Sequence, residues 1–357
     1  MLSPFATPRV AEPRHPSGSD MASAVRDVGG EVLFDAMTHA VFLPGVNKLD
    51  FYDGWELWGT GTPDLNTATA RLDHVERVFA RQARLGAPPL APTLQLASPI
   101  DASAQTAVKL ARVAKGLETG AWQSLAGTSS FWSSGTELDA FVGKLASLRA
   151  PVWVLTFAHE IVVDYKPDLT HVDAWVGFSR TVHSLSERAR VIVAHADLSG
   201  MPAVAAGADT VGSGWDRGQR CFDPNSFRLD SDPGIRIPAS YVTQGGLMAV
   251  MRRDVAEAIE RWDSRQGYRL RGGPMPPSDA VQRMHHLGQL RKAVAAVSGH
   301  SSRSSRVQEL RDRYRAAEAD FDVLNRALGR TVPPSEKGTW ASQPLSVLEA
   351  YASAEGL

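Results

Sequence analysis

Short apolar runs rich in β-branched residues alternate along the chain with segments whose apolar positions recur every three or four residues. The apolar runs lie at 31–37, 94–99, 151–159, 191–194 and 210–211. The periodic segments lie at 69–85, 104–117, 137–148 and 172–189. A short apolar run predicts a buried strand, and a periodic segment predicts a helix that packs on the sheet. The alternation of the two therefore predicts a parallel α/β fold.

The strand count favours a (β/α)8-type TIM barrel over an open, doubly wound sheet. Six or seven of eight strands can be placed, and the sequence is ambiguous at 44–60 and 120–134. A doubly wound dinucleotide fold would carry G-x-G-x-x-G after an early strand, and the chain has no such motif. We expect a disordered leader over 1–24 and the barrel over 25–240.

A change of pattern after residue 240 predicts a helical extension over 241–330, followed by a C-terminal tail over 331–357. Helices are expected at 247–262 and 279–297, and a seven-residue apolar repeat runs through 306–328. The repeat favours a helix packed against its own barrel. An oligomer formed through 306–328 is the alternative.

Composition narrows the class of protein. The 357 residues are 43% hydrophobic with a formal net charge of −1, so no global field attracts nucleic acid or an anionic membrane. No window approaches the roughly 18 apolar residues of a membrane span, and the leader lacks the apolar run of a signal peptide. The single cysteine, Cys221, excludes an intrachain disulfide. We therefore expect a bacterial-type soluble, cytoplasmic protein with no membrane partner.

Four side chains at the ends of predicted strands are the candidate catalytic residues: His195, Asp197, Asp35 and His159. His195 and Asp197 stand two residues apart, so on an extended strand they would project to the same side, at the rim where barrel enzymes place their catalysts. A histidine beside a carboxylate suits general acid/base chemistry. The alternative is a packed histidine and an aspartate that caps the following turn.

A second group of residues is predicted to bind substrate. Glycines 212 and 214 would let backbone N–H groups approach an anion, with Arg217 or Arg220 as a charged partner. The group is completed by His39, Trp55 and Asp216. Trp55 belongs to an aromatic segment that would either stack on a sugar or base or cover the core.

The sequence Ala-Gly-Ala-Asp-Thr-Val-Gly-Ser-Gly at 206–214 resembles the closing βα turn of phosphate- and nucleotide-handling TIM barrels. In layout the chain is also similar to tRNA-guanine-transglycosylase-like barrels, which use acidic residues at strand ends for base exchange. The cysteine-rich zinc site of those enzymes has no counterpart in a chain with one cysteine.

These observations predict a hydrolase or transferase that uses general acid/base chemistry on a small polar substrate, anionic or nucleotide-like. One alternative is a barrel without catalysis that serves as a binding or scaffold subunit, and another is a base-modifying, transglycosylase-like barrel. Residues 252–306 contain 11 Arg and Lys against 5 Asp and Glu, a local excess that would suit nucleic acid. No cofactor or metal ligand is predicted, although the histidines and carboxylates are compatible with a divalent metal.

Overall fold

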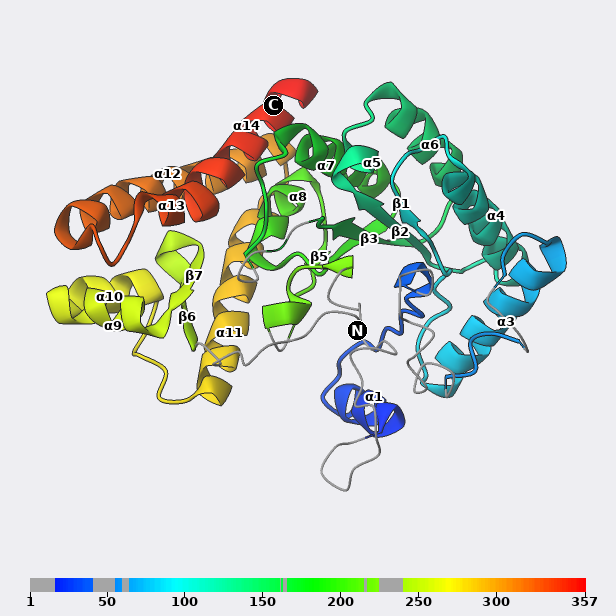
Figure 1. Ribbon diagram of the computed structural model, residues 1–357, viewed down its shortest axis with the longest axis horizontal. Helices are drawn as coiled ribbons and strands as arrows, with labels where there is room; N and C mark the ends of the chain where they lie inside the picture. Colours follow the sequence, from blue (N-terminus) through cyan, green and yellow to red (C-terminus); the bar gives the residue numbers. More distant parts are fainter. Residues whose placement is uncertain are drawn as a thin grey trace. The chain divides into compact units, whose positions relative to one another are not determined.

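The computed structural model describes residues 17–40, 55–59, 64–160, 162, 166–214, 217–224 and 240–357 (Figure 1). The chain divides into two compact units. Unit 1 comprises Met1–Glu160, Glu187–Val191 and Asp223–Asp232. Unit 2 comprises Ile161–Ser186, Ile192–Phe222 and Pro233–Leu357. No helix among the described residues is long and apolar enough to cross a membrane.

Five parallel strands form the main sheet in the order β1-β2-β3-β4-β5. They are β1 Gln95–Leu96, β2 Gln123–Thr128, β3 Val152–Ala158, β4 Arg190–Ala194 and β5 Thr210–Val211. Every residue of β3 is buried, as expected for a strand covered on both faces. The predicted parallel α/β fold is confirmed. Among the described residues, no strand pairing closes this sheet into a barrel.

Within its described residues, unit 1 contains five α-helices, and side chains satisfy the first N–H groups of α1, α3 and α4. These helices are α1 Gly18–Asp27, α3 Ala68–Arg84, α4 Ala102–Leu117, α5 Ser129–Trp132 and α6 Thr136–Ala146. Asp101 accepts a hydrogen bond from Ala104 N at 2.7 Å at the start of α4. Ser17 and Asp20 form a capping box at the start of α1, which overlaps the predicted leader. Residues 1–16 of that leader lie outside the described residues.

The strand predicted at 31–37 is wrong. A single bridge at Phe34 is the only strand-like residue of this segment, and the short helix η1 Thr38–Ala40 follows it. The segment is apolar because Val32, Phe34 and Ala36 belong to the core of unit 1. The carbonyl of Phe34 accepts its hydrogen bond from the side chain of Gln82, at 2.9 Å, and irregular backbone can be buried when a side chain satisfies it in this way.

Unit 2 is mainly helical. It contains α7 Val172–Ser186, η3 Asp197–Gly200, α8 Met201–Ala206, η4 Arg217–Gln219, α9 Arg253–Trp262, α10 Ser264–Arg271, α11 Asp279–Ser298 and α12 Arg303–Leu328. The segment after 331, for which the sequence indicated no element, contains α13 Pro334–Lys337, the π-helical turn η7 Gly338–Ser342 and α14 Gln343–Glu355. Helix α14 packs against α7 and α12.

The helix predicted at 247–262 is partly wrong, because its first residues form a hairpin. Strand β6 Tyr241–Gln244 pairs antiparallel with β7 Ala249–Arg252, and α9 begins only after β7. The connection η6 Gly245–Leu247 ends at Met248, whose φ of 52° closes the turn. Three consecutive residues of β7 are buried, so the segment lacks the alternation that marks a half-exposed strand.

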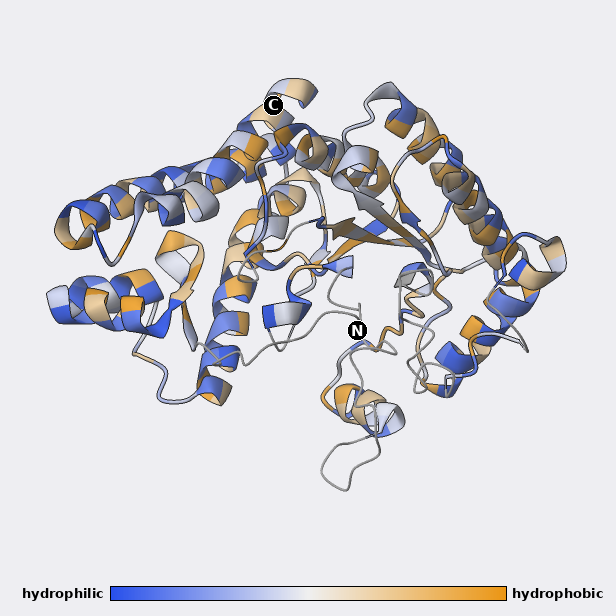
Figure 2. Cartoon of the chain, viewed as in Figure 1, coloured by the Kyte–Doolittle hydropathy of each residue, from blue (hydrophilic) through white to orange (hydrophobic). Residues whose placement is uncertain are grey.

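The seven-residue repeat of α12 is confirmed as an intramolecular seam. Its residues Val307, Leu310, Tyr314, Ala317, Phe321 and Leu324 are all buried. The helix packs against α8, α14 and η6 of the same unit. Figure 2 shows hydrophilic and hydrophobic residues alternating along α12, as expected of a helix with one covered face.

Candidate functional site

The connection from β4 to α8 holds two strained residues. His195 has a φ of 51° and Asp197 a φ of 48°, in the left-handed region that costs a non-glycine residue about 1–2 kcal/mol. The turn is held because the N–H groups of Ala196 and Asp197 both donate to the carbonyl of Gly212, at 3.1 and 3.0 Å. The expectation that His195 and Asp197 project from an extended strand is therefore wrong, since β4 ends at Ala194.

Close backbone packing favours a glycine at position 212. A Cβ atom there would lie 3.3 Å from the Cα of Ala194, the N of His195 and the O of Val193. Its own N–H donates to Val193 O at 2.7 Å. The N–H group that was predicted to contact an anion therefore donates a hydrogen bond to β4 instead.

Three contacts among the described residues of unit 2 hold the side chain of Asp197. Its side chain is buried, and Oδ1 accepts a 2.7 Å hydrogen bond from Leu198 N. Oδ2 lies 3.1 Å from Nε2 of His286 and 3.4 Å from Nε of Arg220. Asp197 therefore has a cationic partner and a histidine partner at the same oxygen.

His286 projects from α11 and is completely buried. Its Nδ1 lies 2.8 Å from Oγ1 of Thr243 on β6, and its Nε2 lies 3.1 Å from Oγ of Ser213. Gln282, one turn earlier on α11, donates to Thr243 Oγ1 at 3.2 Å. Sequence reasoning missed all four of these residues. The available signal was a pair of polar residues, Gln282 and His286, at i and i+4 on an otherwise apolar face.

The contacts of Asp197 determine its charge. Burial is the strongest influence and by itself would raise the pKa of the carboxyl group. The combined effects of His286, Arg220 and the Leu198 N–H outweigh burial and place the pKa of Asp197 below its usual value. Asp197 is therefore a buried carboxylate that is ionised at neutral pH.

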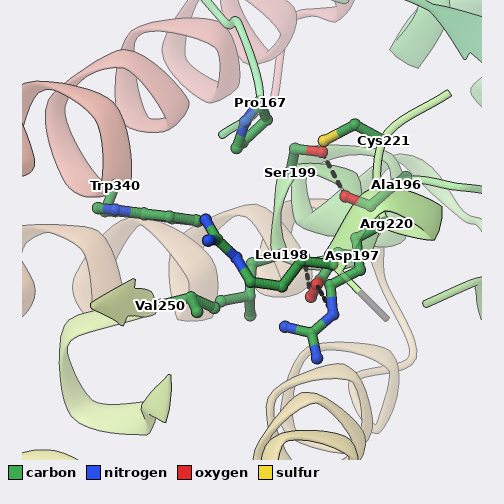
Figure 3. A pocket seen from close by; sticks show the side chains of 10 residues that line it. Pro167, Ala196, Asp197, Leu198, Ser199, Arg220, Cys221, Val250 and Trp340 are labelled. Carbon is green, nitrogen blue, oxygen red and sulfur yellow. Dashed lines mark hydrogen bonds and ion pairs between the residues drawn. The ribbon is translucent and has the colours of Figure 1, made fainter. Parts of the chain in front are cut away.

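Asp197 also lines a small cavity (Figure 3). Its free volume is about 10 Å³, which is room for one water-sized group. Arg217 and Arg220 line it as well, and Val250 and Trp340 contribute apolar surface. Figure 3 shows the Asp197 carboxylate and the Arg220 guanidinium side by side.

The predicted substrate-binding residues of unit 2 are engaged in contacts of their own. The Arg217 guanidinium lies 3.3 Å from the centroid of the Tyr241 ring. The Nε of Arg220 donates to the carbonyl of Gly214 at 3.4 Å. Asp216 lies outside the described residues.

His195 has a defined tautomer in its neutral form. Its Nδ1 lies 2.9 Å from the carbonyl oxygen of Gln219, and a carbonyl only accepts, so Nδ1 carries the proton. Nε2 is then the basic nitrogen. The ring also lies beside Phe222, with 5.8 Å between centroids. Asp197 thus pairs with His286, and His195 is oriented by a backbone carbonyl. The pairing of His195 with Asp197 stays a prediction.

The remaining candidates belong to unit 1. Asp35 accepts a hydrogen bond from Met37 N at 2.8 Å, and His39 and His159 are buried. Trp55 stacks on Phe34 at 5.0 Å and packs against the core of unit 1, so its local role is to cover that core. Convergence of Asp35 and His159 with Asp197 stays a prediction.

Several basic side chains of the segment 252–306 form ion pairs or hydrogen bonds with groups of the same chain. Arg269 pairs with Asp320 at 2.6 Å, and the buried Arg271 pairs with Glu260 at 2.7 Å. Arg303 donates to the carbonyl of Ala206 at 3.1 Å. Nucleic-acid binding through this segment stays a prediction.

Within the described part of the chain, no group of three or more His, Cys, Asp or Glu side chains is arranged to hold a metal ion. Comparisons of the chain with known protein families, with curated proteins and with solved structures found no match.

Proposed function

We propose that unit 2 carries the active site of a hydrolase or group-transfer enzyme that acts on a small polar, anionic substrate, with Asp197 as its central carboxylate. One observation carries the proposal: the buried Asp197 lies between His286 and Arg220 and also lines a cavity. Ionisable groups in such surroundings cluster at functional sites. The strained backbone at His195 and Asp197 supports the same conclusion, because strain of this kind concentrates at active sites.

The roles follow from the charge and hydrogen bonds of each group. A carboxylate whose pKa lies below its usual value is a weak general base, but it suits a nucleophile or a stabiliser of developing positive charge. Acid/base chemistry is assigned to His195, whose neutral form has its basic nitrogen at Nε2. Arg217 and Arg220 line the cavity and suit an anionic group on the substrate.

We also propose that the parallel sheet closes into a (β/α) barrel. A doubly wound sheet reverses its strand order at a switch point, whereas β1 to β5 follow one another in sequence order. Right-handed connections between strands in that order place the helices on one face of the sheet. Closing the sheet into a barrel buries the other face, which favours a (β/α) barrel with a helical C-terminal extension.

A binding or scaffold subunit is the second candidate. The small cavity favours it, because most ligand pockets have volumes of roughly 300–1,000 Å³. The apolar surface of Val250 and Trp340 against the cavity is also typical of packed interior.

Turnover separates the two candidates. The full-length protein is assayed with p-nitrophenyl phosphate, p-nitrophenyl acetate and p-nitrophenyl glycosides, beside the variants Asp197→Asn and Asp320→Asn. Asp320 is a matched control, because it pairs with Arg269 on the surface. We expect turnover of at least one substrate, a fall of about 100-fold or more in Asp197→Asn, and no change in Asp320→Asn. Full activity in Asp197→Asn would exclude the proposed role, and no turnover by the unmodified protein would favour the scaffold.

A further inference from the structure

We infer that Gln282 and Thr243 form a hydrogen-bonded relay that sets the protonation state of His286, keeping its ring neutral with the proton on Nε2. The two residues are thereby positioning residues for Asp197. Their importance for catalysis rests on the proposed function. The relay itself does not, since it is a property of the fold of unit 2.

The relay is a continuous chain of buried polar contacts. The amide Nε2 of Gln282 lies 3.2 Å from Thr243 Oγ1, which lies 2.8 Å from Nδ1 of His286. On the other side of the ring, Nε2 of His286 lies 3.1 Å from Oδ2 of Asp197. Gln282 is 6% exposed, and Thr243 and His286 are 0% exposed, so solvent does not replace these partners.

The direction of each hydrogen bond in the relay follows from which atoms can donate and which can accept. The Gln282 amide nitrogen only donates, so Thr243 Oγ1 accepts from it. Among the described residues, the other hydrogen-bond partner of Thr243 Oγ1 is Nδ1 of His286, which therefore accepts the single hydroxyl hydrogen. A neutral imidazole with an acceptor at Nδ1 carries its proton on Nε2. That proton faces the ionised oxygen of Asp197, so each group has a matched partner.

The charges around His286 are compatible with this state. Asp197 and Arg220 form one buried pair, 8–10% exposed at their side chains. Among the described residues, the charged or titratable groups beside His286 are Asp197, its partner Arg220, and His285, whose Nε2 donates to the carbonyl of Thr243 at 3.1 Å. The carboxylate therefore has Arg220 as its charged partner, and His286 supplies a hydrogen bond.

The relay decides what His286 can do to its other neighbour, Ser213. The distance of 3.1 Å from Ser213 Oγ to His286 Nε2 would suit a serine nucleophile activated by histidine. A base must accept the serine proton, and an Nε2 that already carries a proton cannot. His286 therefore acts as a fixed donor toward Asp197, and Ser213 is not activated through it.

The test reads the protonation of both ring nitrogens of His286 by ¹⁵N NMR of the full-length protein near neutral pH. The resonances are assigned by their loss in His286→Gln. We expect Nε2 to carry a proton and Nδ1 to carry none. The variant Gln282→Glu places an acceptor where the amide donor stood, so Thr243 should donate to Glu and accept from His286. We expect both ring nitrogens to be protonated in this variant.

Two further variants separate the relay from a simple field effect of the new carboxylate. Thr243→Val with Gln282→Glu removes the hydroxyl link, so His286 should return to one proton on Nε2. Thr243→Ser with Gln282→Glu keeps the link and should keep both protons. Persistence of two protons in the valine double variant would overturn the relay.

The unmodified protein supplies a decisive measurement even if the glutamate variants fail to fold. Two protons on His286 near neutral pH, or a single proton on Nδ1, would overturn the inference. The NMR readout does not depend on turnover, so failure of the relay and failure of the proposed enzyme function give different results. Turnover lost in Asp197→Asn, with one proton on Nε2 of His286 in the unmodified protein, would support both.

Discussion

The Nε2 atom of His286 lies 3.1 Å from the Oδ2 atom of Asp197, which joins a turn after β4 to the middle of α11. The Nε atom of Arg220 also lies 3.4 Å from this oxygen of Asp197. The pair fixes the position of α11 against the connection that contains the strained residues His195 and Asp197.

Removing His286 should destabilise unit 2 less than removing both members of the pair. His286→Leu removes a hydrogen bond to the buried carboxylate of Asp197, which keeps Arg220 beside it, and the loss of such a bond costs about 1–3 kcal/mol. The double variant His286→Leu with Asp197→Asn also removes the carboxylate that neutralises the buried Arg220, so its loss should be larger, about 3–5 kcal/mol. Chemical denaturation measures both free energies of unfolding, and equal losses in the two variants would contradict the prediction.

Asp197 should make the protein sensitive to acid. Because its pKa in the folded state lies below the usual value, the carboxylate stabilises the fold above the unfolded pKa, and this contribution is lost as pH falls through the folded pKa. We expect the free energy of unfolding to fall below about pH 4. Asp197→Asn should show a shallower fall in that window, and the same slope in both proteins would show that Asp197 contributes nothing to it.

His74 should add an acid-sensitive contribution in unit 1 at higher pH. Burial, the strongest influence, lowers the pKa of His74 to about 4, and its ring is held between Leu57 O at 2.8 Å and Thr38 Oγ1 at 2.9 Å. The neutral ring stabilises the fold above the unfolded pKa near 6.5, and this stability is lost as pH falls toward 4. The shift corresponds to about 3 kcal/mol.

The fluorescence of Trp58, which stacks on His74 at 3.8 Å between centroids, can follow this transition during denaturation at several pH values. His74→Gln is the control, because an amide does not titrate. Its unfolding free energy should vary less between pH 6.5 and 4, and an unchanged dependence on pH would disprove the assignment to His74.

Leu310→Ala should lower stability without any dependence on protein concentration. Leu310 is completely buried in the seam of α12, and truncation of such a leucine costs about 2–5 kcal/mol. Val323→Ala on the same helix is the matched control, because Val323 is 42% exposed and its truncation should change stability by less than about 0.5 kcal/mol. A midpoint that shifts with protein concentration would instead indicate a dimer interface.

Gly127→Ala should destabilise unit 1 by overpacking. A Cβ at Gly127 would lie 2.3 Å from Cδ1 of Phe131, a buried ring with edge contacts to Trp132 and Phe141. We expect a loss of about 1–3 kcal/mol in thermal or chemical denaturation. Gly116→Ala, exposed at the end of α4 with no atom near the added methyl group, should gain up to about 1 kcal/mol. A neutral Gly127→Ala would show that Phe131 can move.

The strands and helices that depend on local pattern were predictable from the sequence. The runs at 151–159 and 191–194 became β3 and β4, and the repeat at 306–328 became the buried face of α12. The strand predicted at 31–37 is absent. An apolar run can belong to a strand or to an irregular core segment whose backbone is hydrogen-bonded by a side chain such as Gln82, and the sequence does not distinguish the two. The hairpin of β6 and β7 was not predicted, because burial of consecutive residues removes the alternation of apolar and polar positions that marks a strand.

The sequence by itself determined that Asp197, Arg217 and Arg220 follow strands of a parallel α/β fold. The tertiary structure decided that Asp197 pairs with His286, that Thr243 and Gln282 complete the contacts of that histidine, and that His195 turns to the carbonyl of Gln219. Periodicity reports which side of an element is buried. It does not report which distant polar group is buried against it, because each partner is supplied by another part of the fold.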